Sequence, residues 1–477
     1  MANPDRLSGV DASFLHLEDD GVHMHVGSVL VFEGPAPAYD ELIARLRARL
    51  HLVPRYRQKL AYPPLVQSRP VWVDDPHFHL SYHVRHTALP APGGEAELKR
   101  LAGRVLAQRL DRGKPLWELW LVDRVGEERF ALVGKSHHAL VDGISGADLV
   151  SVLFESSPRP PEPEWPLPEW PLPEWTPGPE PSGAALLADA MAERAGLPVA
   201  AARAAGGAAG GALVRPDRAA GRILRAIAGL GSMAAVSSPL NVPIGPHRRY
   251  DWVQADLDEF RAIKTALGGT VNDVVLTVVA GALRAHWLAH DRPVGGVELR
   301  AMVPVSVRAD AERGALGNRV SMVWAPLPLH AADPLERFRI VHGAMAGLKE
   351  SGQAVGAEVL TRLTGFAPPT VLQQAARLQT RQRLFNLTVT NVPGPQEPLY
   401  LLGRRMLAFH PQVPLAGNTA LGIAVMSYAG TIDFGLLSDY DALPDLGALA
   451  ADLDAAIAKL AVAAGVRRRV PRPVTAA

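Results

Sequence analysis

The sequence predicts an α/β protein of two halves joined by a long linker, and three observations support this. The chain has 477 residues, more than one hydrophobic core usually holds. Patterns typical of strands and of helices are mixed in both halves. Between the halves, residues 158–181 are rich in proline, which suits neither a helix nor a sheet interior. We therefore predict an N-terminal lobe over 1–157, a linker over 158–238 and a C-terminal lobe over 239–477.

Hydrophobic periodicity predicts the elements of the N-terminal lobe. Runs of β-branched and apolar residues indicate strands, and apolar residues spaced by three or four positions indicate helices. We expect strands at 26–32, 117–125 and 130–133, and helices at 40–50, 95–110 and 144–153. The last of these strands runs directly into Ser136-His137-His138.

The linker and the C-terminal lobe differ in composition. A Trp-Pro-Leu-Pro-Glu unit occurs twice in the linker and predicts an extended connector, followed by an Ala/Gly-rich, partly mobile helical stretch.

In the C-terminal lobe we expect helices at 274–288, 334–348, 359–378 (broken at Pro368-Pro369) and 446–464. We also expect strands at 297–307 and 387–392, and a hairpin of 421–428 with 431–437. The sequence does not predict the order of the strands.

Composition argues against several classes of protein. The 49 Lys and Arg residues almost balance the 48 Asp and Glu residues, which disfavours a nucleic-acid-binding protein. Without cysteine, disulfides, thiolate nucleophiles and Cys-ligated metal centres are excluded. The N-terminus lacks a signal-peptide pattern, and the best membrane-span candidate, 196–214, is mostly Ala and Gly. We expect a cytoplasmic protein whose contact with a membrane or lipid droplet is peripheral.

The run His137-His138-Ala139-Leu140-Val141-Asp142-Gly143 is the main candidate for catalysis. It lies where a strand ends and a helix begins, a common place for catalytic groups. An imidazole can take a proton from a hydroxyl group near neutral pH. Asp142 could orient the loop or the ring, or pair with a distant arginine, and Gly143 permits a turn. From the residues alone, catalysis and a chance occurrence fit equally well.

Other chemistry is disfavoured around this run. Consecutive histidines on an extended segment point to opposite faces, and no metal-ligand pattern stands nearby, so we expect no metal. The chain has no Gly-x-Ser-x-Gly elbow and no dinucleotide-binding fingerprint. Gly134-Lys135-Ser136 fails as a phosphate-binding loop because Arg129 stands where glycine is required. A single histidine base acting on a bound hydroxyl group is the simplest remaining scheme.

The histidine run resembles the HHxxxDG signature of coenzyme A-dependent acyltransferases and of peptide-synthetase condensation domains. Pro115-Leu116-Trp117 narrows the resemblance to the bacterial wax ester synthase / acyl-CoA:diacylglycerol acyltransferase family. Further segments resemble that family in the same order: Leu7-Ser-Gly-Val-Asp11-Ala-Ser-Phe14, Met24-His25-Val26-Gly27, Pro239-Leu-Asn241-Val-Pro-Ile-Gly245-Pro-His-Arg-Arg249, Thr270-Val-Asn272-Asp273-Val274, Val303-Pro304-Val-Ser306-Val-Arg308, Gly317-Asn318-Arg319 and Thr390-Asn391-Val392-Pro393-Gly394-Pro395. Thr390 and Val242 depart from the usual Ser and Gly.

The resemblance implies two chloramphenicol-acetyltransferase-like lobes with an active site in a channel between them. It implies that fatty acyl-CoA is the donor substrate, that diacylglycerol or a long-chain alcohol is the acceptor, and that no cofactor is needed. Triacylglycerols or wax esters would be the products. His138 would be the base, supported by His137, and Asn272 and Asp273 fall at a motif that the family needs for activity.

Two other functions remain open at this stage. A condensation-type enzyme, forming an ester or amide on a carrier-bound substrate, shares the histidine motif but should lack the other motifs. A non-catalytic lobe could retain the same scaffold. Asn272 and Asp273 could simply cap the helix that follows them.

We expect Asp142 to be mainly structural. The resemblance implies that the motif aspartate forms a salt bridge with an arginine, and Arg308 is the best candidate. If that pair is buried, Asp142→Ala and Arg308→Ala should each destabilise the protein by about 3–5 kcal/mol, because one charge is left alone. Urea unfolding should show that the double variant loses less than the sum of the two. An Asp142→Asn variant with unchanged stability but severely reduced turnover would contradict this role.

Overall fold

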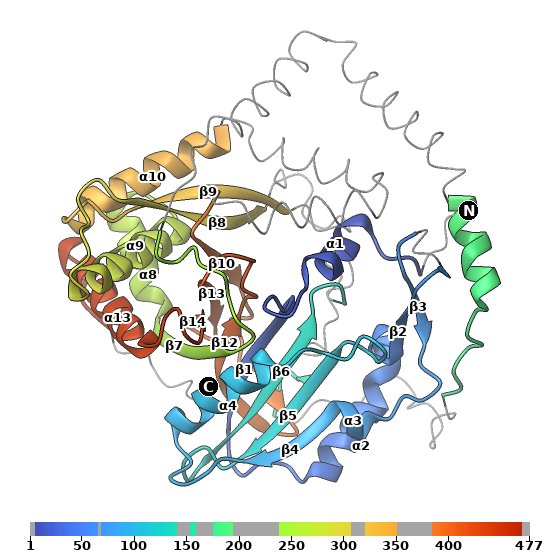
Figure 1. The fold of residues 1–477 in the computed structure, drawn as a ribbon. Helices are drawn as coiled ribbons and strands as arrows, with labels where there is room; N and C mark the ends of the chain where they lie inside the picture. Colours follow the sequence, from blue (N-terminus) through green and yellow to red (C-terminus); the bar gives the residue numbers. More distant parts are fainter. Residues whose placement is uncertain are drawn as a thin grey trace.

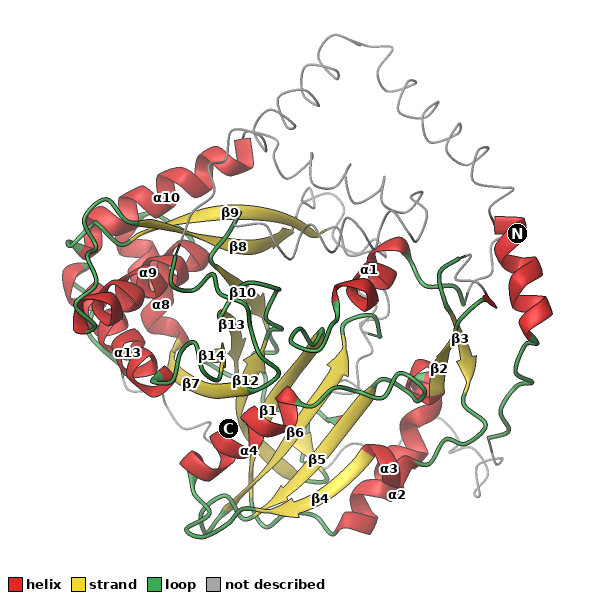
Figure 2. Ribbon diagram, viewed as in Figure 1, coloured by secondary structure: helices red, strands yellow, loops and turns green. Residues whose placement is uncertain are grey.

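The computed structural model describes residues 5–64, 68–140, 153–158, 175–193, 238–306, 320–350 and 384–469. Two six-stranded sheets with associated helices make up this part of the chain (Figures 1 and 2). The predicted mixed α/β fold with two sheet-containing lobes is therefore confirmed. Each lobe has its own hydrophobic core.

The first sheet has the order β11-β12-β1-β6-β5-β4. Its central strand β1 (His25–Glu33) pairs antiparallel with β6 (Arg129–His137) on one side and with β12 (Arg404–Gln412) on the other. The remaining strands are β5 (Trp117–Asp123), β4 (Val84–Ala88) and β11 (Tyr400–Leu401), and β2 (Gln58–Ala61) pairs separately with β3 (Val71–Asp74). This order places the end of β6 beside the start of β1.

Helices cover both faces of the first sheet. On one face, α4 (Glu95–Ala107) packs Leu98 and Val105 against Val29 and Val133. The other face packs against α1 (Gly9–Leu17) and α2 (Tyr39–Arg49). The same lobe also contains the short helices α3 (Leu80–His83), η1 (Leu50–Leu52) and η2 (Pro54–Arg57). Residues 183–193 are also helical.

The second sheet has the order β7-β14-β13-β10-β8-β9. Its strands are β7 (Arg248–Asp256), β14 (Thr431–Asp439), β13 (Leu421–Tyr428), β10 (Leu387–Pro393), β8 (Glu298–Ser306) and β9 (Val320–Pro328). Four helices pack on it: α8 (Leu257–Leu267), α9 (Val271–Ala289), α10 (Pro334–Glu350) and α13 (Leu446–Ala463). Figure 1 shows them gathered on the side away from the first sheet.

A strand from late in the chain joins the first lobe. Residues 400–412 follow most of the C-terminal lobe in sequence, yet β12 pairs with β1 along Gly27 to Phe32. The end of β12 then crosses β14, where a Cβ on Gly435 would lie only 1.7 Å from the carbonyl oxygen of Pro411. The Tyr250 hydroxyl donates to that same oxygen at 2.8 Å. This crossing joins the two sheets, and the sequence did not predict it.

Most predicted elements that fall on described residues are present. The helices expected at 40–50, 95–110, 274–288, 334–348 and 446–464 correspond to α2, α4, α9, α10 and α13, and the predicted hairpin corresponds to β13 and β14. The expected strand at 130–133 is longer and reaches His137. The helices expected at 144–153 and 359–378 and most of the linker lie outside the described residues, whereas residues 175–181 have neither helix nor strand structure.

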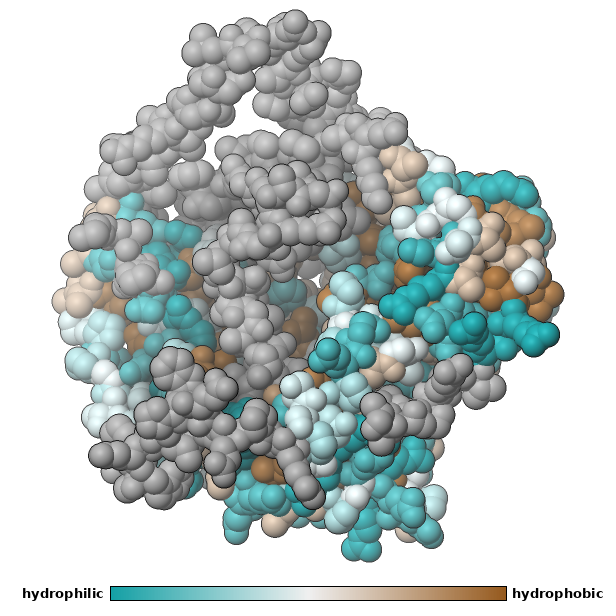
Figure 3. All heavy atoms as spheres, turned by 180° about the vertical axis from the view of Figure 1, so that it is seen from behind, coloured by the Kyte–Doolittle hydropathy of each residue, from teal (hydrophilic) through white to brown (hydrophobic). Residues whose placement is uncertain are grey.

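The described part of the chain has no helix that is by itself long and apolar enough to cross a membrane. The pair α8 and α9 passes such a test together, but the two are bent by 99° at their junction. Figure 3 shows hydrophilic and hydrophobic residues interspersed over the described surface on that side. Exposed apolar side chains such as Leu52 and Val462 are common on protein surfaces and need no special explanation.

Candidate active site

Backbone hydrogen bonds on both sides fix the end of β6, where the histidine pair lies. The His137 N–H donates to the Leu116 carbonyl at 2.9 Å, and the His138 N–H donates to the Met24 carbonyl at 2.8 Å. Leu116 belongs to the Pro115-Leu116-Trp117 motif, so this motif holds the histidine turn from the β5 side. Because Leu116 and Met24 directly precede β5 and β1, the strands that flank β6, the backbone of the histidine pair is held from both sides.

The His138 ring stacks on Phe14 of α1, with ring centroids 3.9 Å apart and an interplanar angle of 23°. The side chain is half-buried, and its Nδ1 makes no hydrogen bond to another residue in the described part of the chain. Burial lowers the pKa of His138, and a contact with its own backbone opposes this only in part. The ring is therefore neutral near pH 7, which is the state that a general base requires.

His137 faces a different set of neighbours. The Ala139 N–H donates to His137 Nδ1 at 3.0 Å, so Nδ1 is the acceptor and Nε2 carries the hydrogen. His137 Nε2 then points toward Glu18 Oε1 at 3.6 Å. Burial lowers the pKa of His137 to about 3, so it stays neutral at physiological pH. This arrangement suits a supporting residue better than a base.

Glu18 is a buried carboxylate at the centre of this cluster. Its side chain is 2% exposed and lies 3.5 Å from His25 Nε2 through Oε1. Its Oε2 accepts hydrogen bonds from Arg112 Nε at 2.9 Å and Nη2 at 2.6 Å. Burial alone would raise the pKa of Glu18, but His25, His137 and Arg112 together lower it to about 2. Glu18 is therefore ionised and ties α1 to the histidine strand.

Sequence analysis missed Glu18. The family-like segment at 7–14 ends four residues before it, and a single acidic residue after an apolar helix carries no distinctive signal. Its importance depends on Arg112 and His25, which the fold brings in from other segments.

Asn272 and Asp273 lie on the first turn of α9, and the described contacts of Asp273 do not include the histidine turn. The helix begins at Val271 with Thr270 as N-cap, and Asp273 Oδ2 accepts the Thr270 N–H at 2.8 Å in a capping box. The same oxygen lies 2.9 Å from His342 Nδ1 of α10. Asp273 thus has a structural role in helix capping. Asn272 is half-buried beside it on the same turn.

The remaining predicted site residues, Asp142, Gly143 and Arg308, fall outside the described residues, so the proposed Asp142–Arg308 pair stays a prediction.

In the Thr390–Pro395 segment, a Cβ on Gly394 would lie 2.3 Å from the Ser427 carbonyl oxygen. Glycine is therefore required there by the close approach of two backbones.

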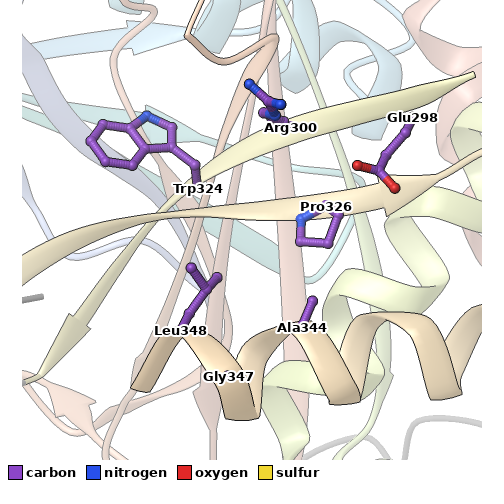
Figure 4. A pocket seen from close by; sticks show the side chains of 7 residues that line it. All are labelled: Glu298, Arg300, Trp324, Pro326, Ala344, Gly347 and Leu348. Atoms are coloured by element: carbon purple, nitrogen blue, oxygen red, sulfur yellow. The ribbon is translucent and has the colours of Figure 1, made fainter. Parts of the chain in front are cut away.

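Two of the hollows among the described residues are lined by residues other than the histidine pair. A cavity of about 320 Å³ lies between β8, β9 and α10, and Figure 4 shows Trp324 and Leu348 among its lining side chains. A groove of about 820 Å³ runs between α4 and residues 246–251 and 440–447. The groove carries basic side chains, including Lys99, Arg104 and Arg249.

The two mixed sheets, with the histidine turn at the end of β6, define a two-lobed protein of the chloramphenicol-acetyltransferase-like fold class. Residues 7–275 match the wax ester synthase/diacylglycerol acyltransferase catalytic domain, and residues 316–461 match the C-terminal domain of the same proteins. The chain belongs to the wax ester synthase/diacylglycerol acyltransferase family.

Individual relatives agree with this assignment. "Probable diacyglycerol O-acyltransferase tgs1" of Mycobacterium tuberculosis H37Rv is 33% identical over 98% of this chain and 97% of its own length. "Probable diacyglycerol O-acyltransferase tgs2" of the same strain is 33% identical over 96% and 98%. The wax ester synthase/diacylglycerol acyltransferase from Marinobacter aquaeolei VT8 is 28% identical, with a TM-score of 0.66 over 97% of this chain and 100% of that chain.

A condensation domain shares the fold. The starter condensation domain of rhizomide synthetase, solved as a point mutant in complex with C8-CoA, has a TM-score of 0.55 at 16% identity over 98% of this chain and 96% of that chain. At that identity the likeness concerns architecture alone.

Proposed function

We propose that this protein transfers a fatty acyl group from acyl-CoA to diacylglycerol, to a long-chain alcohol, or to both. The observation that carries the proposal is the placement of His138 within the matched catalytic domain. Its ring is neutral and stacks on Phe14, and its backbone N–H donates to the Met24 carbonyl. The relatives named above, which cover nearly the whole chain, support the same chemistry.

The proposed reaction is a direct transfer with both substrates bound. His138 removes the hydroxyl proton of the acceptor as its oxygen attacks the thioester carbonyl carbon. The tetrahedral intermediate then breaks its carbon–sulfur bond, and the proton passes from His138 to the departing thiolate of CoA. The products are an ester and free CoA, so no cofactor or metal is consumed. A donor must stabilise the oxyanion, and Asn272, a backbone N–H or a Ser or Thr hydroxyl could supply it.

Glu18 and His137 are positioning residues in this scheme. The ionised carboxylate accepts from Arg112 and faces the Nε2–H of His137, which fixes the end of β6 behind the base. In this scheme neither group takes up the proton, and their effect on the rate passes through the orientation of His138.

The acceptors imply contact with a lipid surface. Diacylglycerols and long-chain alcohols partition into membranes and lipid droplets, so we propose a cytoplasmic protein that binds such surfaces peripherally. Arg468, one of the C-terminal arginines, contributes little to this contact, because it donates to both carboxylate oxygens of Glu259 at 3.1 Å. That guanidinium group is already neutralised within the protein.

Product analysis tests the proposed function. The purified chain is incubated with labelled palmitoyl-CoA and with diolein, hexadecanol or no acceptor, and the lipids are separated. We expect labelled triacylglycerol, wax ester or both, with CoA released in equal amount. A non-catalytic lobe would form neither product. A condensation-type enzyme would acylate only a carrier-bound acceptor, and either result would overturn the proposal.

A further inference from the structure

A second cluster of histidines and carboxylates lies in the C-terminal lobe, where α9 ends and α13 begins. His286 is in the last turn of α9, and His290 follows one turn later on the same face. Asp445 is the N-cap residue of α13, and Asp452 lies further along that helix. The nearest nitrogen or oxygen atoms of His286, His290 and Asp445 all lie within 4.8 Å of one another.

The hydrogen bonds of this cluster fix the orientation of His290. Its Nδ1 lies 2.7 Å from the backbone carbonyl oxygen of His286, which can only accept, so Nδ1 carries the hydrogen. A neutral His290 therefore has its lone pair on Nε2. That nitrogen faces Asp445 Oδ2 at 2.8 Å. Two lone pairs at this distance repel each other unless a cation or an added proton lies between them.

His286 points to the same carboxylate oxygen. Its side chain is 3% exposed, and its Nε2 lies 3.7 Å from Asp445 Oδ2. Its Nδ1 has no hydrogen bond within the described part of the chain, and the nearest acceptor there is Asp452 Oδ2 at 3.5 Å.

Asp445 lacks the capping hydrogen bond that aspartate usually makes at a helix N-terminus. Aspartate at an N-cap normally accepts a backbone N–H of the first turn. The side chain of Asp445 makes no such capping bond, and its carboxylate instead faces the two imidazoles.

We propose that His286, His290 and Asp445 form a binding site for a divalent transition-metal ion of the zinc class. The ligands are Nε2 of each histidine and Oδ2 of Asp445, and water takes the fourth position. Two ligands at the usual zinc distances and a tetrahedral angle lie about 3.3 Å apart. The two measured nitrogen–oxygen separations, 2.8 and 3.7 Å, fall on either side of that value.

The surroundings match those of known metal sites. Histidine ligands usually donate their second ring hydrogen to a carbonyl or carboxylate oxygen. The His286 carbonyl oxygen accepts this hydrogen from His290 Nδ1, and Asp452 Oδ2 is placed to accept it from His286 Nδ1. The cluster around Glu18 is less suited to a metal ion. The Ala139 N–H donates to His137 Nδ1, so His137 Nε2 carries the hydrogen and has no lone pair for a metal. The sequence-based expectation of no metal rested on the histidine run alone, and the proposed site, on other elements, runs against that expectation.

The site would fasten the end of α9 to the start of α13. These two helices contact each other extensively and cover the second sheet in Figure 1. The site contains none of the residues proposed for catalysis, so its occupancy can be tested independently of acyl transfer.

Metal titration of the full-length chain tests the proposal. Protein stripped with a chelator is titrated with Zn²⁺ by calorimetry, and with Co²⁺ by visible absorption. We expect wild type to bind one Zn²⁺ through this site, and Zn²⁺ to raise its Tm. His290→Ala, whose side chain is 39% exposed and dispensable for the core, should lose that binding and the Tm rise. Asp452→Asn should weaken binding by about 10- to 100-fold, as expected for an outer-shell residue.

His330→Ala is the matched control. His330 is an exposed histidine of the same lobe that also contacts a backbone carbonyl, that of Val297. This variant should bind Zn²⁺ like wild type. No binding by wild type would overturn the proposal. Equal binding by wild type and His290→Ala would also overturn it, because the ion would then be held elsewhere.

Discussion

Replacement of His138 by alanine should lower kcat by about 100- to 10,000-fold, the usual contribution of a positioned general base. The variant retains the backbone bonds to Met24 and Leu116, so the end of β6 should keep its place. It loses the ring that stacks on Phe14 and takes up the hydroxyl proton. Initial rates of CoA release with saturating palmitoyl-CoA and hexadecanol measure the effect.

His86→Ala is a suitable control for this variant. His86 belongs to the same sheet and stacks on Tyr39, with ring centroids 5.8 Å apart, but lies outside the proposed site. Its turnover should remain near that of wild type. If a folded His138→Ala protein turned over at nearly the wild-type rate, His138 would not be the base.

Replacement of Glu18 by alanine should lower the free energy of unfolding by about 3 kcal/mol. This is the lower end of the usual range for breaking a buried ion pair, because Arg112 is 31% exposed and partly solvated. The change also leaves His25 and His137 without their buried carboxylate, so turnover should fall as well. Urea unfolding and initial rates give the two readouts.

The same residue predicts a dependence of stability on pH. The pKa of Glu18 is depressed from 4.5 to about 2 in the folded protein. The stabilisation from a depressed carboxyl pKa is fully present above the unfolded value and is lost as pH falls through the folded value. The free energy of unfolding of wild type should therefore exceed that of Glu18→Gln by the largest amount above pH 4.5. This difference should shrink as the pH falls below 4.5. A difference that stayed constant down to about pH 3 would show that the charge of Glu18 is unimportant.

Elements set by local sequence were predictable. Helix α9 combines an apolar run with Thr270 and Asp273 in a capping box, so pattern and cap agree. Strand β9 lacked such a signal because it contains Pro326 and Pro328, which usually argue against a strand. The fold tolerates both because β9 lies at the edge of its sheet.

Elements set by distant contacts were not predictable. Strand β12 carries Arg404, Arg405 and Pro411 and lacks a clean alternation, and its partner β1 lies hundreds of positions earlier in the chain. The sequence placed His137 and His138 correctly at the end of a strand, because the apolar run of β6 leads into them. It could not show that Glu18 and Arg112 meet behind them, since that contact exists only in the folded chain.

The pH dependence of kcat/KM, measured for wild type and His138→Gln together, tests the proposed base most directly. Only neutral His138 can accept a proton, and burial lowers its pKa below the ordinary 6.5. Wild-type kcat/KM should therefore stay constant as pH falls through 6.5 and decline only at lower pH. The weakly active His138→Gln variant should lack that decline. The same acidic decline in both proteins would assign it to another group and contradict the role of His138.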